Sequence, residues 1–180
     1  MKTFISALIV MGSILQASDG QPLSRIWEDI SYTGDTSVSQ RLDIYLPETH
    51  QNSYPAVIII YGSAFFGNNL KKAAFEVLGN PLLQSGFAVV AVNHRSSREA
   101  IFPAQIQDIK AAIRYIRGKG PAYRIDTSFI GITGYSSGGH LSALAGTSGS
   151  VSQMTVNSAS ADLEGGLGEF TGLSSSVDAV

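Results

Sequence analysis

The residues of this chain most able to do chemistry form one short motif, Gly134-Tyr135-Ser136-Ser137-Gly138-Gly139-His140. It follows an apolar run at residues 129–133, which reads as a strand, and precedes a small-residue helix expected over residues 141–145. Glycines two positions before and after Ser136 allow a sharp turn that strains the serine backbone and exposes its hydroxyl. The pattern therefore predicts a nucleophile elbow, with Ser136 placed to attack an acyl carbonyl.

The motif depends on its context, because the chain contains 19 glycines and an ordinary glycine-rich turn is the competing interpretation. The strand before the motif and the helix after it favour the elbow. Ser137 is not an alternative centre, because Tyr135, rather than a glycine, stands two positions before it. Only Ser136 fits.

The elements around the motif indicate an α/β fold. Residues 25–33 and 40–46 predict an antiparallel strand pair with one wet face, since apolar and polar residues alternate along the second segment. Unbroken apolar runs at residues 56–60 and 87–92 are typical of parallel strands covered on both faces. We therefore expect a mostly parallel sheet with flanking helices and right-handed crossovers.

Two crossover helices are expected between these strands. The first covers residues 69–78, with Pro81 and Gly86 marking the return to the sheet. The second begins near Pro103 and ends at Gly118, with isoleucines recurring at helical spacing on its core face. Both should pack against the sheet.

The last part of the chain has no sustained periodicity. Residues 146–176 are small, polar and glycine-rich, and they predict a long surface loop, either a substrate-facing rim or a flexible connection. Residues 177–180 resemble the opening of a further buried strand.

Length and composition bound the class of protein. The chain has 180 residues, 44% of them hydrophobic, so a single domain is expected. A net charge of −2 without basic runs argues against nucleic acid as a partner. No cysteine is present and the three histidines are scattered, so no metal centre and no cofactor is expected.

The first residues have the pattern of a secretory signal. A lysine at position 2, an apolar stretch over residues 4–15 and small residues at 17–18 predict a signal peptide at residues 1–18, leaving a domain at residues 19–180. A buried first helix is the alternative, and a membrane span is disfavoured because the stretch is short. We expect a secreted or periplasmic protein without a stable membrane span after signal removal.

From about Ile44 to Val180 the chain resembles the α/β-hydrolase superfamily, and within it the secreted carboxylesterases and lipases related to the hormone-sensitive-lipase group and to acetylxylan and feruloyl esterases. Three motifs in order carry this resemblance: Tyr61-Gly62-Ser63-Ala64-Phe65, then Asn93-His94-Arg95 with Phe102-Pro103-Ala104 and Asp108, then Gly134 to His140. It implies a partial α/β-hydrolase fold and a serine hydrolase of small acyl or carbohydrate-linked esters.

The first motif implies an oxyanion hole. Tyr61 stands where the family usually has histidine, and Ser63 stands where it has a second glycine. Oxyanion donors of this kind are backbone N–H groups, which a change of side chain does not delete. The resemblance therefore assigns the N–H of Gly62 or Ser63 together with that of Ser137, at the positive end of the elbow helix.

The catalytic acid and histidine of this superfamily follow the serine, and almost nothing follows here. His140 is the one histidine after Ser136; four residues along the same helix, it is expected to point into the helix-packing layer. His94 and His50 precede the serine and are poor candidates for its base. Asp108 is expected to pair with Arg95, and no role is carried onto three further acidic residues: Asp162, Glu164 and Asp178.

The chain thus looks like the amino-terminal two-thirds of an esterase, truncated at its carboxyl end, with the nucleophile but without the acid and base. Its partner would be a small-molecule or carbohydrate ester. Two other functions stay open: a non-catalytic carbohydrate- or protein-binding remnant of the fold, and a peptidase or amide hydrolase on the same fold.

One outcome follows for the purified 180-residue chain. Without a base, the rate of ester hydrolysis is expected to fall by several powers of ten. The chain should therefore hydrolyse a short-chain nitrophenyl ester no faster than its Ser136→Ala variant. Initial rates of nitrophenol release compare the two proteins. A large gap between them indicates a base within the chain.

Overall fold

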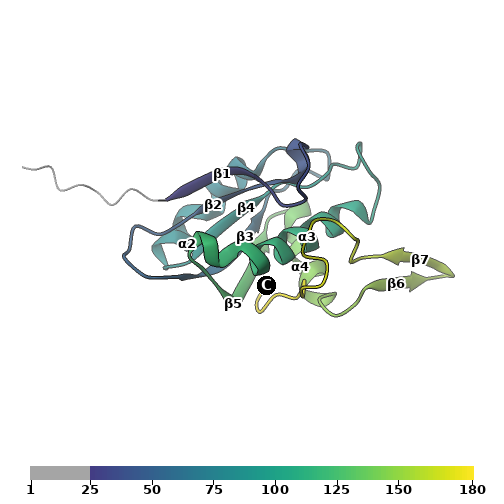
Figure 1. The fold of residues 1–180 in the computed structure, drawn as a ribbon. Helices are drawn as coiled ribbons and strands as arrows, with labels where there is room; N and C mark the ends of the chain where they lie inside the picture. Colours follow the sequence, from purple (N-terminus) through teal and green to yellow (C-terminus); the bar gives the residue numbers. More distant parts are fainter. Residues whose placement is uncertain (1–24) are drawn as a thin grey trace, which may run out of the picture.

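A computed structural model of the chain describes residues 25–180, so the predicted signal peptide lies outside the described residues. A central sheet with strand order β1-β2-β4-β3-β5 organises the fold (Figure 1). Its strands are β1 (Ile26–Ser31), β2 (Arg41–Tyr45), β3 (Tyr54–Ile60), β4 (Ala88–Val92) and β5 (Ile125–Gly134). Within this sheet β2 runs against the other strands, because β1 and β4 both pair with it antiparallel while β3 pairs parallel with β4 and β5. The predicted α/β class and mostly parallel sheet are confirmed.

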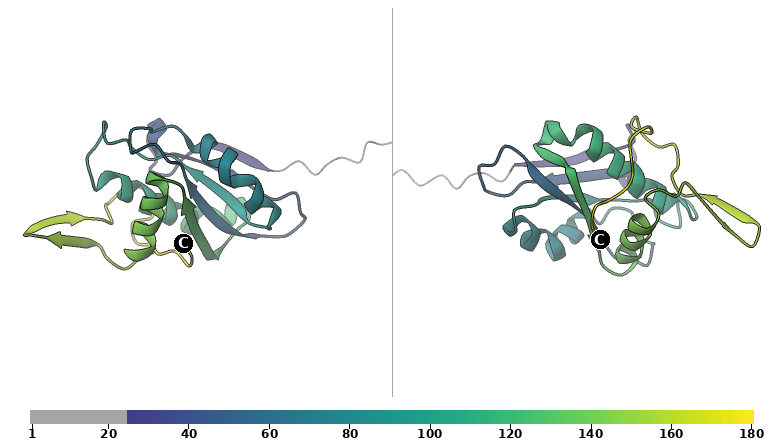
Figure 2. Two further views of the ribbon diagram at one scale, coloured as in Figure 1. Left: turned by 180° about the vertical axis from the view of Figure 1, so that it is seen from behind. Right: turned by 90° about the horizontal axis from the view of Figure 1, so that it is seen from below.

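Helices cover both faces of the sheet (Figure 2). On one face lie α1 (Lys71–Ala74), the π-type turn η2 (Phe75–Gly79) and α2 (Asn80–Gln84). On the other lie α3 (Ala104–Lys119) and α4 (Ser137–Thr147). Two 3-10 turns, η1 (Val38–Gln40) and η3 (Gly120–Tyr123), complete the connections. Among residues 25–180, none of these helices is long and apolar enough to cross a bilayer.

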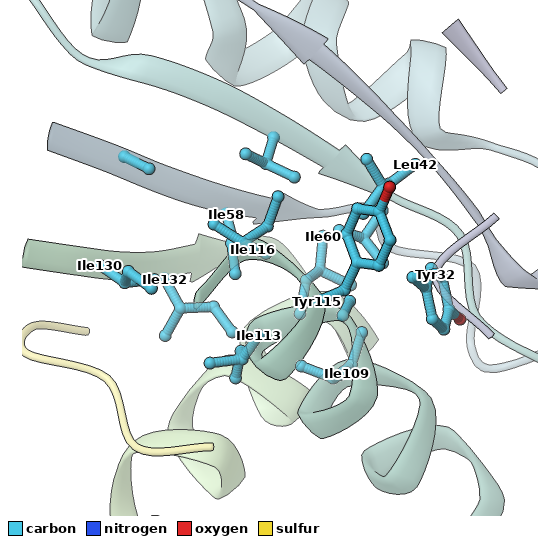
Figure 3. Packing of buried hydrophobic residues seen from close by; sticks show 14 of the residues in the cluster. Tyr32, Leu42, Ile58, Ile60, Ile109, Ile113, Tyr115, Ile116, Ile130 and Ile132 are labelled. Atoms are coloured by element: carbon cyan, nitrogen blue, oxygen red, sulfur yellow. The ribbon is translucent and has the colours of Figure 1, made fainter. Parts of the chain in front are cut away.

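The core between the sheet and α3 explains why the helix forms where its isoleucine spacing predicts. Ile109, Ile113 and Ile116 project from one side of α3 toward Ile58 of β3 and Ile132 of β5 (Figure 3). Each of these side chains is at most 2% exposed. Burial of one such side chain stabilises the fold by about 1.5–3 kcal/mol, so this face fixes α3 and the strand that leads into the elbow.

The first crossover helix is longer than the sequence predicted. Helical backbone continues from Lys71 to Gln84, whereas residues 69–78 were expected. Pro81 does not mark the return to the sheet; it lies within this helical run, at the start of α2 and directly after the π-type turn η2. Gly86 does mark the return, with a φ of 87° that favours glycine.

The prediction that one face of the strand pair is exposed to solvent is wrong for β2. Asp43 is 0% exposed and Tyr45 is 6% exposed. The Asp43 carboxylate accepts the Asp29 N–H at 2.7 Å and lies 3.3 Å from Lys71 Nζ. The first helix covers this side of the sheet, and the lysine supplies the charge that a buried carboxylate needs.

The predicted surface loop at residues 146–176 contains a hairpin, β6 (Gln153–Val156) with β7 (Ala159–Asp162), which extends away from the body of the molecule in Figures 1 and 2. The chain beyond it is anchored to α3. Lys110 Nζ lies 3.0 Å from a Glu164 carboxylate oxygen, and Arg114 pairs with the other oxygen. Lys110 also donates to the Ser148 carbonyl at 2.6 Å. Two buried cations therefore hold this segment.

The last residues begin to extend the sheet beyond β5. Ala179 forms a parallel bridge with Gly131, and the Ile132 N–H donates to its carbonyl at 2.9 Å. The predicted strand opening is borne out in its direction, but it is not fully buried: Val177 is half-buried against the core and residues 178–180 are exposed.

The anchor gives a stability prediction. Glu164→Ala leaves Lys110 and Arg114 buried without their carboxylate, and we expect a loss of about 3 kcal/mol in the free energy of unfolding. Glu169→Ala is the matched control, because the exposed Lys119–Glu169 pair at 3.5 Å should contribute less than about 1 kcal/mol. Urea unfolding measures both, and equal losses would contradict the assigned anchor.

The same pair predicts a pH dependence. Burial raises the pKa of Glu164, but hydrogen bonds from Lys110 and Ser175 outweigh it and lower that pKa overall. The stabilisation is therefore complete above the unfolded-state pKa of about 4.3, and it is lost as the pH falls through the lower folded-state pKa. The difference in free energy of unfolding between wild type and Glu164→Ala should therefore shrink as the pH falls below about 4.3. Urea unfolding at a series of pH values measures it.

Candidate active site

Ser136 lies at a sharp turn between the end of β5 and the start of α4. Its backbone has φ 55° and ψ −124°, a region that a residue with a side chain rarely adopts, and its surface is exposed. The His140 N–H donates to the Ser136 carbonyl at 3.1 Å, which starts the helix immediately after the serine. The turn has the strand–turn–helix form that the sequence predicted.

Glycines at the turn are required by close approach of backbone to backbone. A Cβ added to Gly138 would lie 2.3 Å from the Ile60 carbonyl oxygen, and one added to Gly134 would lie 2.6 Å from the Gly138 carbonyl carbon. Both distances are too short for real Cβ atoms. The carboxyl end of β3 therefore lies directly against the elbow, and this contact leaves no room for side chains at the two glycines.

The loop after β3 continues along the elbow. A Cβ added to Gly62 would lie 2.7 Å from Ser136 Cβ, so the backbone of this loop touches the serine. One residue further, the Ser63 N–H donates to Ser137 Oγ at 2.9 Å. Two successive residues of the loop and two of the elbow thus lie side by side.

The three amides predicted as oxyanion donors differ in their availability. The Ser63 N–H is taken by Ser137 Oγ. Within residues 25–180, no acceptor takes the N–H of Gly62 or of Ser137, and the latter is the first residue of α4. The geometry therefore favours Gly62 over Ser63 as the direct partner of the Ser137 amide, which the positive end of the helix reinforces.

His140 does not point into the helix-packing layer, so that prediction is wrong. The side chain is exposed, and its ring meets Phe65 edge-on at 5.8 Å between centroids. The neighbouring Leu141 faces the core instead, and this sets the opposite side of α4 toward solvent. His140 borders a cavity of about 240 Å³ whose wall also includes Ala64, Phe65, Ser97, Phe102, Gln105 and Leu141.

The other two histidines lie away from the serine. His94 is fully buried, with Nδ1 2.9 Å from the Arg95 carbonyl and its ring stacked on Tyr61 at 4.8 Å. Burial lowers the pKa of His94, which keeps it neutral, and burial raises the pKa of Tyr61. His50 is exposed in the connection before β3, at the opposite end of the parallel strands from the elbow. In the described part of the chain, no histidine ring hydrogen-bonds the Ser136 hydroxyl.

Asp108 forms the structural ion pair that the sequence predicted. Its carboxylate accepts the Arg95 backbone N–H at 2.8 Å and the Arg95 Nε at 2.9 Å. Gln40 Nε2 donates to the same group at 2.8 Å, a contact that the sequence pattern did not reveal. Burial raises the pKa of Asp108 against the opposing effect of Arg95. This carboxylate fixes the end of β4 to α3.

The other acidic residues also have structural contacts. Glu164 belongs to the anchor of the carboxyl-terminal segment, and Asp162 accepts the Glu164 N–H at 3.0 Å. Asp178 accepts the Ile130 N–H at 2.8 Å. Across residues 25–180 no group of three histidine or acidic side chains is placed to hold a metal ion.

Residues 42–180 match the family model described as BD-FAE. The chain belongs to the BD-FAE family. The predicted resemblance to α/β-hydrolase carboxylesterases is thereby confirmed.

Solved structures similar to this BD-FAE chain include carbohydrate esterases. A bifunctional GH43-CE protein of Bacteroides eggerthii is 57% identical, with a TM-score of 0.85, over 86% of this chain and 20% of that chain. A truncated form of a carbohydrate esterase from gut microbiota is 53% identical, with a TM-score of 0.87, over 89% of this chain and 56% of that chain.

A curated relative of this BD-FAE chain is the probable carboxylic ester hydrolase LipM of Mycobacterium tuberculosis, 34% identical over 128 residues. That match covers 67% of this chain and 30% of LipM. The chain spans a third or less of the length of the curated relatives it matches.

The contact between β3 and the elbow gives a prediction for Gly138→Ala. The new Cβ would meet the Ile60 carbonyl, so we expect a loss of about 1–3 kcal/mol or a failure to fold. Gly166→Ala is the control, because a Cβ there meets nothing within 4 Å. Thermal unfolding followed by circular dichroism compares them. A Gly138→Ala variant as stable as the control would refute the close approach.

Proposed function

We propose that this BD-FAE chain supplies the nucleophile and the oxyanion donors of an esterase that works through an acyl-enzyme on Ser136. The observation that carries the proposal is the contact of Gly62 with Ser136, which sets two unused amides beside an exposed, strained serine. Amides fixed in advance stabilise negative charge without reorganisation, which is the largest single contribution in many acyl-transfer enzymes.

The proposed reaction has two steps. Ser136 Oγ loses its proton to a base and attacks the ester carbonyl, and the N–H groups of Gly62 and Ser137 hold the resulting oxyanion until the alcohol leaves. Water then attacks the acyl-enzyme and releases the acid. Because none of the described histidine rings hydrogen-bonds the Ser136 hydroxyl, this scheme takes the base to be a group other than the imidazoles of His50, His94 and His140 in their described positions.

The proposed substrates are small acyl or carbohydrate-linked esters. The cavity of about 240 Å³ is bordered by His140 and Leu141, on the helix that the elbow starts, and not by Ser136 itself. It is smaller than the roughly 300–1,000 Å³ typical of sites for larger ligands, which favours a short acyl or alcohol group. Two similar structures are a GH43-CE protein and a carbohydrate esterase, which supports a carbohydrate-linked ester. Export is also proposed, on the pattern of residues 1–18 alone.

Chemical rescue tests the mechanism in the chain as it exists. Imidazole in solution can act as the general base, so added imidazole should raise turnover of nitrophenyl acetate by wild type to at least about tenfold above Ser136→Ala. The variant is assayed at the same imidazole concentrations, which removes the direct reaction of imidazole with the ester. Nitrophenol release is measured.

Circular dichroism spectra of both proteins establish that each is folded. Ser142→Ala serves as a second control, because Ser142 lies on the same helix with its hydroxyl bonded to the Gly138 carbonyl at 2.8 Å. It should keep the wild-type rate. Equal rates for wild type and Ser136→Ala at every imidazole concentration would overturn the proposed function.

A further inference from the structure

The side chain of Ser137 makes an unusual contact for a serine in a helix. Its Oγ accepts the Ser63 N–H at 2.9 Å, across the gap between the elbow and the loop after β3. The residue is only 7% exposed. An oxygen that accepts a hydrogen bond still carries its own proton, so the hydroxyl has one donor left to use.

Other hydroxyls of the same helix donate their proton to backbone carbonyls of that helix. Ser142 donates to the Gly138 carbonyl at 2.8 Å, Thr147 to the Ala143 carbonyl at 2.8 Å, and Ser148 to the Leu144 carbonyl at 2.6 Å. Ser137 makes no such bond, and among the described residues its hydroxyl proton has no acceptor. An unused donor at a nearly buried position costs free energy unless a ligand accepts it.

We propose that the Ser137 hydroxyl is a third oxyanion donor, acting beside the Ser137 N–H and the Gly62 N–H. This rests on the proposed function, since the oxyanion is the one formed when Ser136 attacks an ester. The amide and hydroxyl of one residue can converge on a single oxygen. The Ser63 N–H polarises the hydroxyl from behind and so acts through it, because hydrogen bonds in a chain strengthen one another.

The proposal gives the Ser63 amide an indirect role, through its hydrogen bond to Ser137 Oγ. The Ser63 amide does not donate to the oxyanion directly, because it donates to Ser137 Oγ instead. Ser137 does not compete with Ser136 as nucleophile, because it is buried within the first turn of α4, whereas Ser136 is exposed. No bond to Ser137 forms or breaks; its hydroxyl only donates to the negative oxygen.

The test compares Ser137→Ala, Ser137→Thr and Ser142→Ala in the imidazole-rescued assay. We expect Ser137→Ala to lower kcat by about tenfold or more with KM changed less than about twofold, because the donor acts mainly on charge that develops in the transition state. Ser137→Thr keeps the hydroxyl and should retain most of kcat. Ser142→Ala removes a buried hydroxyl from the same helix and should match wild type.

A Ser137→Ala variant with kcat equal to wild type or higher overturns the proposal, because the freed Ser63 N–H then serves at least as well. If Ser137→Ala does not fold, Ser137→Cys keeps the shape with a weaker donor, and it should also lower kcat. Failure of the proposed function is a separate result, seen when wild type itself is no faster than Ser136→Ala.

Discussion

The close approach of the loop after β3 to the elbow is the constraint on which the site depends. At Gly62 and Gly138 there is no room for a Cβ, so backbone meets backbone at the point where the serine is presented. This contact places the Gly62 amide beside Ser136 and brings Ser63 within hydrogen-bond distance of Ser137. The position of every proposed oxyanion donor follows from it.

The rest of the fold holds these two segments in place. Helix α3 packs its isoleucine face on β3 and β5, the two strands whose ends form the site. Its polar residues make two sets of contacts: Asp108 fixes the end of β4 through Arg95, while Lys110 and Arg114 anchor the segment around Glu164. One helix therefore ties the sheet, the elbow layer and the carboxyl-terminal segment together.

Features set by local pattern could be predicted from the sequence. Unbroken apolar runs predict the buried strands, the isoleucine spacing predicts α3, and the glycines around Ser136 predict the turn. These patterns succeed because the periodicity of a strand or helix decides which face is buried. Asp108 and Arg95 could also be paired, since Arg95 follows the apolar run of β4 and Asp108 lies near the start of α3, the next helix along the chain.

Features set by distant contacts could not be predicted. The burial of Asp43 depends on Lys71 from the first helix, and the order of residues 146–176 depends on cations of α3. The exposed position of His140 follows from the rotation of α4 that Leu141 sets against the core. The contact of Ser137 with Ser63 joins two segments far apart in the sequence, so no local spacing of residues predicts it.

The most direct measurement is a crystal structure of the chain after reaction with an alkyl phosphonate in the presence of imidazole. The account predicts phosphorus bonded to Ser136 Oγ, with the phosphoryl oxygen within hydrogen-bond distance of the amides of Gly62 and Ser137. Phosphorus on another serine, or a phosphoryl oxygen turned away from Gly62, would contradict it.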